Sequence, residues 1–219
     1  MTRVKVKGRS PIAFAAKTRS DFSVCDLDHR LWLKSEPSVV DSYWSGEKAP
    51  ESRSFESRFV WSEEFLYVRF DCEQHEPLVI QDAPDVTRKT YRLWEKDVCE
   101  VFIAPDPKSP ENYFEFEVAP TGEWLDLKIQ QKPDERITDR SYTSGMEAAA
   151  RIGTESVILA IKVPWTAFGT KPSAGDRWRM NVFRLVGSGD SRGYLAWSPT
   201  MTEIPNFHVP EKFGELSFM

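Results

Sequence analysis

Side-chain polarity alternates with a period of two along most of this chain, and this pattern restricts the fold more than any other feature. In the segment EFLYVRFDCE (64–73), Leu66, Val68 and Phe70 alternate with aromatic and charged residues. Successive side chains of a strand point to opposite faces, so the pattern predicts strands with one buried face. It predicts ten strands, over 54–62, 64–73, 97–105, 112–120, 123–131, 146–153, 156–164, 177–187, 193–199 and 214–219.

Turn-forming segments separate these strands at short spacing, as in APDPKSPEN, PTG and GSGDSRG. This arrangement predicts an all-β fold, a two-sheet antiparallel β-sandwich of immunoglobulin or jelly-roll-like architecture. The only helical signal is a single turn at 164–169, and we expect polar loops at 106–111 and 132–145. There is no repeat and no linker-like stretch, so we expect one domain over 1–219, although no strand is predicted within 1–53.

Composition excludes several classes of partner. The formal net charge of −5 argues against a general nucleic-acid surface or an anionic membrane surface. No stretch approaches the ~20 apolar residues of a membrane span. The basic start contains only the short apolar run IAFAA, too short for a secretory signal, which predicts a cytoplasmic protein, or an extracellular one if an export signal has been removed. The sequence carries no signal for an oligomeric state.

The segment RLWEKDVCEVFIAP (92–105) combines a tryptophan before a buried strand with an acid inside that strand. Alternation places Cys99, Val101 and Ile103 on the core face, so Glu100 projects from the opposite face, near Trp94. In YFEFEV (113–118) the same alternation places two further acids, Glu115 and Glu117, opposite the three apolar residues. If the two strands are neighbours, Glu100 lies ~5 Å from one of these acids.

An indole beside a carboxylate forms a suitable surface for binding a sugar. The C–H face of a pyranose stacks on an aromatic plane, and its hydroxyls make bidentate hydrogen bonds with carboxylates. An edge tryptophan with a solvated glutamate would give the same pattern, so this signal is weak by itself.

Several blocks together resemble carbohydrate-binding module family 9 and its relatives in the DOMON superfamily. They are YRLWEKDVCEVFIAP, YFEFEVAPTGEW, RWRMNVFR and YLAWSPTMTEIPNFHVPEKFGELSF, and the similarity covers roughly 55–219. The W-E-x-D-x-x-E-x-F-I pattern of the family begins here at Trp94. The closing pattern of the family is W-S, followed by an aromatic residue and then by P-x-K-F-G. In this chain the aromatic residue is Phe207. Members of the family occur attached to xylanases and also as free-standing proteins, so the resemblance links the chain to polysaccharide catabolism.

The resemblance implies a β-sandwich that clamps a terminal sugar between two aromatic planes. Trp94 would be the first plane, Phe207 the second, and Glu100 would bind sugar hydroxyls. Two departures affect the ligand preference. The second plane in sugar-binding members is tryptophan, and the family's arginine on the neighbouring strand is replaced here by Glu117. Glu117, Arg184, Asn206 and His208 are candidates for the remaining wall of the pocket.

No cofactor is expected, with calcium as the one exception to consider. The resemblance implies structural calcium ions, and the acidic stretches DCEQHEP, QDAPDV and PDP could supply oxygen ligands. None of them has the spacing of a known calcium loop.

Three other interpretations remain open. Glu100 with Glu117 has the carboxylate separation of a retaining glycoside hydrolase, although we expect binding without catalysis. A haem-binding domain of the DOMON type would use Met180 or Met201 with His208. Finally, the departures at Phe207 and Glu117 are compatible with a scaffold that has lost its ligand.

Overall fold

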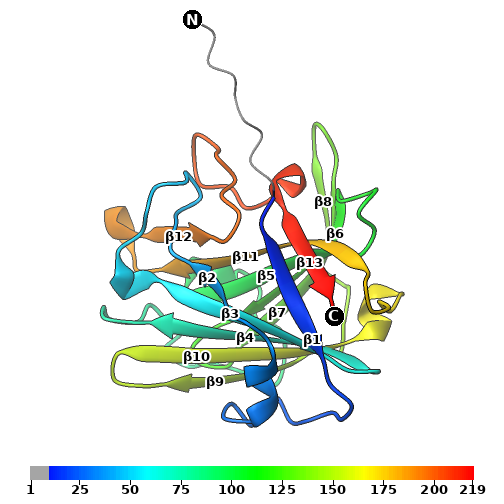
Figure 1. Ribbon diagram of the computed structural model, residues 1–219. Helices are drawn as coiled ribbons and strands as arrows, with labels where there is room; N and C mark the ends of the chain where they lie inside the picture. Colours follow the sequence, from blue (N-terminus) through cyan, green and yellow to red (C-terminus); the bar gives the residue numbers. More distant parts are fainter. Residues whose placement is uncertain (1–9) are drawn as a thin grey trace, which may run out of the picture.

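The computed structural model describes residues 10–219, so the basic start of the chain lies largely outside the described residues. Nearly all regular structure is β (Figure 1), which confirms the all-β prediction. The strands are β1 (Ile12–Lys17), β2 (Ser38–Val40), β3 (Phe55–Trp61), β4 (Phe65–Glu73), β5 (Val98–Ala104), β6 (Asn112–Val118), β7 (Trp124–Gln131), β8 (Arg136–Asp139), β9 (Glu147–Ile152), β10 (Ser156–Pro164), β11 (Arg177–Val186), β12 (Gly193–Ala196) and β13 (Gly214–Phe218).

Helical structure in the described residues is confined to short 3-10 turns. They are η1 (Arg30–Lys34), η2 (Glu51–Arg53), η3 (Leu93–Glu95), η4 (Trp165–Phe168), η5 (Gly189–Ser191) and η6 (Pro210–Lys212). The single turn expected at 164–169 corresponds to η4. No helix within 10–219 combines the length and the hydropathy needed to cross a bilayer.

The strands form one hydrogen-bonded path and not two separate sheets. Its order is β8-β7-β6-β5-β11-β13-β1-β3-β4-β10-β9, with β12 paired to β11 and β2 paired to β3. β1 joins the two halves of this path, and it runs parallel to both β13 and β3. The sheet is therefore mixed, and the expectation of purely antiparallel pairing is wrong at β1.

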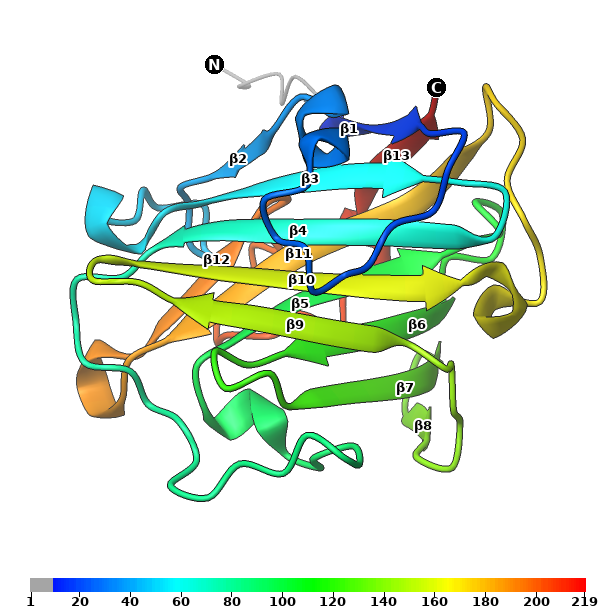
Figure 2. The same ribbon diagram turned by 90° about the horizontal axis from the view of Figure 1, so that it is seen from below.

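The half of the path from β3 to β9 lies over the half from β8 to β13 (Figure 2). Between them lies the largest core cluster, to which each half contributes apolar side chains. β4 supplies Val68 and Phe70, and β5 supplies Val101 and Ile103, all fully buried. Burial of this shared apolar area is the main stabilising contribution to the fold.

A second apolar cluster covers the outer face of β5, β6 and β11. It includes Phe102 and Phe183 from these strands, Leu93 from η3, and Phe207 and Phe213 from the C-terminal segment. Because of this covering, all seven residues of β5 are buried, on both faces of the sheet. The polar side chains of the outer face are consequently enclosed as well.

Three strands were missed by the sequence pattern. β1 is the run IAFAAK, in which the buried side chains are the alanines Ala13 and Ala15, while Ile12 and Phe14 are exposed. β2 has only three residues. β8 lies inside the polar loop predicted at 132–145, so that prediction is wrong over Arg136–Asp139.

Gly214 is the first residue of β13, and its Cα lies close to neighbouring residues. A Cβ added there would overlap the ring of Trp197 and lie 2.7 Å from the carbonyl oxygen of Pro11. We predict that Gly214→Ala lowers the free energy of unfolding by about 1–3 kcal/mol, the usual cost of overpacking. Gly153→Ala is the matched control, because its nearest contact is the rotatable hydroxyl of Ser156 at 2.7 Å. Urea denaturation of both variants measures the difference, and equal losses would contradict the steric explanation.

Candidate functional site

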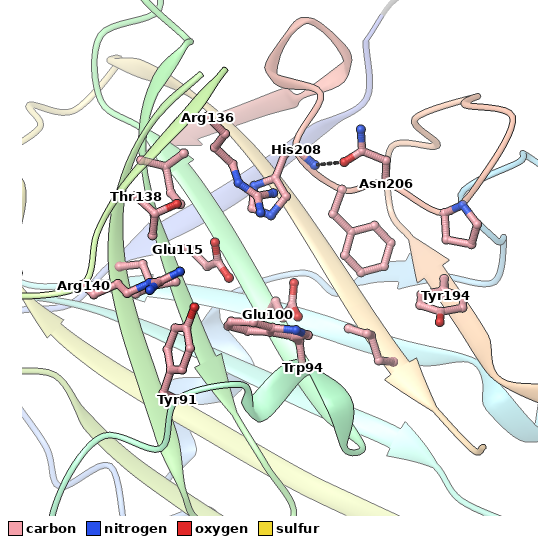
Figure 3. Close-up of a pocket in the computed structure, with 15 residues that line it drawn as sticks. Tyr91, Trp94, Glu100, Glu115, Arg136, Thr138, Arg140, Tyr194, Asn206 and His208 are labelled. Atoms are coloured by element: carbon pink, nitrogen blue, oxygen red, sulfur yellow. Dashed lines mark hydrogen bonds between the residues drawn. The ribbon is translucent and has the colours of Figure 1, made fainter. Parts of the chain in front are cut away.

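A cavity of about 300 Å³ opens on the outer face of β5 and β6 (Figure 3). Its size is at the lower end of the range of about 300–1,000 Å³ that is typical of small-molecule sites. Its walls include side chains from η3, from the β8 region and from the segment before η6. Among the residues predicted from the sequence, the lining includes Trp94, Glu100, Asn206, Phe207 and His208.

The position of Trp94 is fixed by the strained backbone just before η3 and by hydrogen bonds from one arginine. Arg92 precedes η3 in the left-handed region, with φ of 66°. The guanidinium of Arg192 donates to the carbonyl oxygens of Trp94 and Lys96, at 2.8 and 2.9 Å. Tyr91 packs edge-on against the indole, with 5.2 Å between ring centroids. The half-buried indole is thus supported from its backbone and its edge.

Phe207 also lines the cavity and is 8% exposed. Its ring is stacked on Phe183, with centroids 4.0 Å apart and an interplanar angle of 11°. Tyr194 meets it nearly edge-on, at 6.2 Å. One face of the Phe207 ring is therefore covered by the protein. The two aromatic residues far apart in sequence, Trp94 and Phe207, line one cavity.

His208 follows Phe207 in the chain and is held in place by Tyr113, whose hydroxyl oxygen lies 2.7 Å from His208 Nδ1. Burial lowers the pKa of His208 to about 3, with a smaller effect from the charge of Arg136. The imidazole is therefore neutral at pH 7. The backbone N–H of His208 donates to Asn206 Oδ1 at 3.0 Å, which orders the amide at the rim.

Three buried glutamates lie at the floor. Glu100 on β5 is directly opposite Glu117 on β6, as the alternation predicted, and Glu115 projects from the same face two residues earlier. They are 2%, 0% and 3% exposed, respectively. Glu100 and Glu115 line the cavity, whereas Glu117 does not. Neither carboxyl oxygen of Glu117 has a hydrogen-bond partner among the described residues.

Burial raises the pKa of all three carboxyl groups. The charge of Glu115 raises the pKa of Glu100 further, and the charges of Glu100 and Glu115 do the same for Glu117. Three ionised carboxylates at this spacing would repel one another with little solvent to screen them. Burial and mutual repulsion therefore both oppose ionisation of the acids at the floor.

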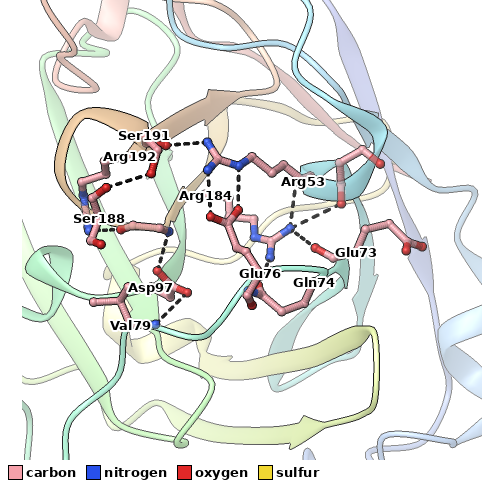
Figure 4. A network of polar contacts seen from close by, with 12 residues as sticks. Arg53, Glu73, Gln74, Glu76, Val79, Asp97, Arg184, Ser188, Ser191 and Arg192 are labelled. Carbon is pink, nitrogen blue, oxygen red and sulfur yellow. Dashed lines mark hydrogen bonds and ion pairs between the residues drawn. The ribbon is translucent and has the colours of Figure 1, made fainter.

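Arg184 does not line the cavity. It alternates with Phe183 and Leu185 on β11, so its side chain enters the opposite layer (Figure 4). There its guanidinium donates to the carbonyl oxygens of Arg53 and Glu73, at 2.9 and 2.7 Å, and to the side chain of Gln74. The prediction that Arg184 forms part of the cavity wall is therefore wrong.

Asp97, part of the tryptophan-containing block, also has a structural position. Its two carboxyl oxygens accept from the backbone N–H groups of Gly187 and Val79, at 2.8 and 3.1 Å (Figure 4). These bonds tie the start of β5 to the end of β11 and to the segment before η3. The side chain thereby helps to place Trp94 without entering the cavity.

Sequence reasoning missed several lining residues, including Tyr91, Tyr194 and an alternating set on one side of the cavity. That set is Arg136, Thr138 and Arg140. The alternation with a period of two in RITDR could have indicated a strand. It lies in a polar stretch, however, without the neighbouring apolar residues that mark the other strands. Tyr91 stands three residues before Trp94 and could have been included with it.

The methionine–histidine pairs considered for haem are not supported by their positions. Met180 is fully buried in the main core, on the face of β11 opposite the cavity. Met201 is 61% exposed.

In DCEQHEP, one of the three acidic stretches considered for calcium, two acids are paired with arginines. Asp71 pairs with Arg69 and Glu76 with Arg53. Within the described residues, no group of three or more acidic, histidine or cysteine side chains is arranged to hold a metal ion.

Comparisons with known proteins identify relatives over most of the chain. A family model described as carbohydrate family 9 binding domain-like matches residues 26–219. A protein of Arthroderma benhamiae, described as an extracellular protein, is 21% identical over 176 residues, which are 74% of this chain and 77% of the relative.

Solved structures share the fold. A candidate carbohydrate-binding protein from Bacteroides uniformis has a TM-score of 0.74 at 18% identity, over 96% of this chain and 100% of its own. Family 9 carbohydrate-binding modules from Caldicellulosiruptor kristjanssonii, in complex with cellotriose and with glucose, have TM-scores of 0.67 and 0.65 at 11% identity. These cover 95% of this chain and 93% and 96% of their own.

The buried Glu117 leads to a prediction about stability and pH. Its carboxyl pKa is raised in the folded state, so the folded protein retains a proton that the unfolded chain releases above about pH 4.3. Its contribution to stability therefore falls as pH rises through and beyond that value. We compare the change in the free energy of unfolding that Glu117→Gln causes at two pH values. We predict that this change is more stabilising at pH 8 than at pH 4, by about 1–3 kcal/mol.

Urea denaturation at the two pH values measures this difference. Glu47→Gln, at an exposed position, is the control and should show no such dependence. An effect of Glu117→Gln that is equal at pH 4 and pH 8 would mean that the carboxyl is not held protonated.

Proposed function

The chain belongs to the carbohydrate family 9 binding domain-like family, and from this membership we propose that it binds carbohydrate in the cavity between Trp94 and Phe207. The observation that carries the proposal is that these two rings, 113 positions apart, line one cavity of about 300 Å³. The related modules from Caldicellulosiruptor kristjanssonii, which share the fold, were solved with cellotriose and glucose.

In the proposed complex, a pyranose stacks on the indole of Trp94 and contacts the phenyl ring of Phe207 on its other side. The apolar C–H face of the sugar suits these rings, and each stacked pair contributes about 0.5–1.5 kcal/mol beyond area burial. Phe207 keeps one face on Phe183, so only its other face is offered to a ligand. Trp94 is consequently the dominant plane.

Sugar hydroxyls would find both donors and acceptors at the floor. A protonated carboxyl group donates one hydrogen bond and accepts others. Glu100 and Glu115 therefore match hydroxyl groups, which have the same dual capacity. Asn206 and His208 add an amide and a neutral imidazole at the rim. Glu117 lies beneath the lining and supports this floor without reaching a ligand.

We infer that the chain binds without hydrolysing its ligand. A retaining glycosidase places two carboxyl groups about 5 Å apart at the scissile bond, one of them ionised as the nucleophile. Glu117, the second member of the pair Glu100–Glu117, is fully buried and does not line the cavity. A carboxyl group that cannot reach the substrate cannot act as its nucleophile.

The proposed setting is extracellular, linked to the breakdown of polysaccharides by glycosidases. Support comes from the Arthroderma benhamiae relative, described as extracellular. The cytoplasmic expectation receives no support from the comparisons.

Removing the indole tests the proposal. We predict that Trp94→Ala weakens the binding of glucose and cellotriose by about five- to thirtyfold, since loss of a stacking plane removes about 1–2 kcal/mol. Isothermal titration calorimetry measures the change. Phe14→Ala is the control, because Phe14 is an exposed aromatic residue on β1 that does not line the cavity. Unchanged affinity in Trp94→Ala would place the sugar elsewhere.

A substitution at the floor separates binding from catalysis. We predict that Glu100→Gln weakens sugar binding by about three- to tenfold, because the amide reproduces only part of the hydrogen bonding of the acid. Neither protein should release reducing ends from cellotriose. Hydrolysis by the native protein, lost in Glu100→Gln while binding is retained, would instead establish a glycoside hydrolase.

A further inference from the structure

Two arginines form one side of the cavity. Arg136 begins β8 and Arg140 follows it, so with Thr138 between them they alternate onto the same side and line the cavity. Figure 3 shows both side chains directed toward the space between Trp94 and His208. Arg140 also lies over the ring of Tyr91, with 4.6 Å from its guanidinium carbon to the ring centroid. Both are exposed to solvent.

Neither guanidinium is paired with an acidic side chain among residues 10–219. Within residues 10–219, neither Arg136 nor Arg140 makes an ion pair or a side-chain hydrogen bond, and residues 1–9 contain no acid. Other arginines are neutralised, as in Arg53–Glu76 at 2.6 Å and Arg151–Asp28 at 2.6 Å. The lining of the cavity thus contains two arginines without an acidic partner, in a chain with net charge −5.

The other groups of the cavity do not cancel this charge. Burial raises the pKa of Glu100 and Glu115, which opposes their ionisation, and it lowers the pKa of His208 to about 3. Arg136 is near enough to lower the pKa of Glu115, but burial has the larger effect and the pKa is raised. Even a single ionised carboxylate at the floor would leave the cavity with a net positive charge.

We propose that the cavity selects a pyranose bearing a carboxylate, a uronic acid, whose anionic group lies against the guanidinium groups of Arg136 and Arg140. This inference rests on the proposed carbohydrate binding and adds the class of ligand. A guanidinium presents paired N–H donors that match a planar carboxylate. The ring of the sugar would occupy the space beside Trp94, and its hydroxyls would meet the carboxyl groups of Glu100 and Glu115. A sulfated sugar shares the anionic charge but not the planar geometry.

The test compares sugars that differ only at C6. The native protein is titrated with D-glucose against D-glucuronic acid and with D-galactose against D-galacturonic acid, using calorimetry and tryptophan fluorescence at pH 7. At least one acid should bind about tenfold more tightly than its neutral counterpart, the effect of one charge-assisted hydrogen bond. Raising the salt from about 20 to 500 mM should reduce this advantage several-fold, since exposed charges are screened.

Substitutions locate the effect. In Arg136→Gln and in Arg140→Gln, the advantage of the acid should fall about three- to tenfold, and in the double variant it should disappear. Arg19→Gln is the matched control, an exposed arginine outside this cavity. Circular dichroism verifies that each variant is folded.

The outcomes separate this proposal from the one on which it rests. Neutral sugars that bind as tightly as the acids, or an advantage that survives the double substitution, would overturn the uronic-acid proposal and leave carbohydrate binding intact. Binding of glucose 6-sulfate more tightly than glucuronic acid would overturn the assignment to a carboxylate. If none of these sugars binds, both proposals fail.

Discussion

The structure depends on the burial of the outer face of β5, β6 and β11. A strand in a two-layer β-protein usually has one solvated face, but every residue of β5 is buried here. Leu93 of η3 and the pair Phe207 and Phe213 close that face. The same covering encloses Glu100, Glu115 and Glu117 at 0–3% exposure. Enclosed acids at adjacent positions favour their neutral forms, and the electrostatics of the cavity follows from that.

The covering segments are themselves held by polar contacts to backbone. Asp97 binds two backbone N–H groups, and Arg192 binds the carbonyl oxygens of Trp94 and Lys96. A charged side chain that satisfies several backbone groups fixes loop geometry more firmly than a single ion pair on the surface. The cavity is thus built on loops but supported by the sheet.

Sequence reasoning was accurate where burial repeats with a period of two. The hairpin of β3 and β4, the core face of β5 and the facing positions of Glu100 and Glu117 follow directly from that repeat. β1 was missed because its buried residues are alanines, which carry little hydrophobic signal, and β8 because its neighbours are polar. Arg184 was misplaced although alternation with Phe183 gives its side, since its partners lie over a hundred positions away.

The composition of the site also has a consistent energetic explanation. Phenylalanine at 207 in place of the tryptophan of sugar-binding relatives reduces stacking, a contribution of about 0.5–1.5 kcal/mol. A charge-assisted hydrogen bond contributes about 1.5–3 kcal/mol, so one guanidinium on an anionic sugar would more than offset that loss. The glutamate at 117, where the family carries an arginine, removes a cation from the floor. Arg136 and Arg140 supply positive charge from a solvent-exposed part of the cavity lining. If the uronic-acid proposal holds, the two departures that the family resemblance implies, at 117 and 207, are parts of one change, from recognition by stacking toward recognition by charge.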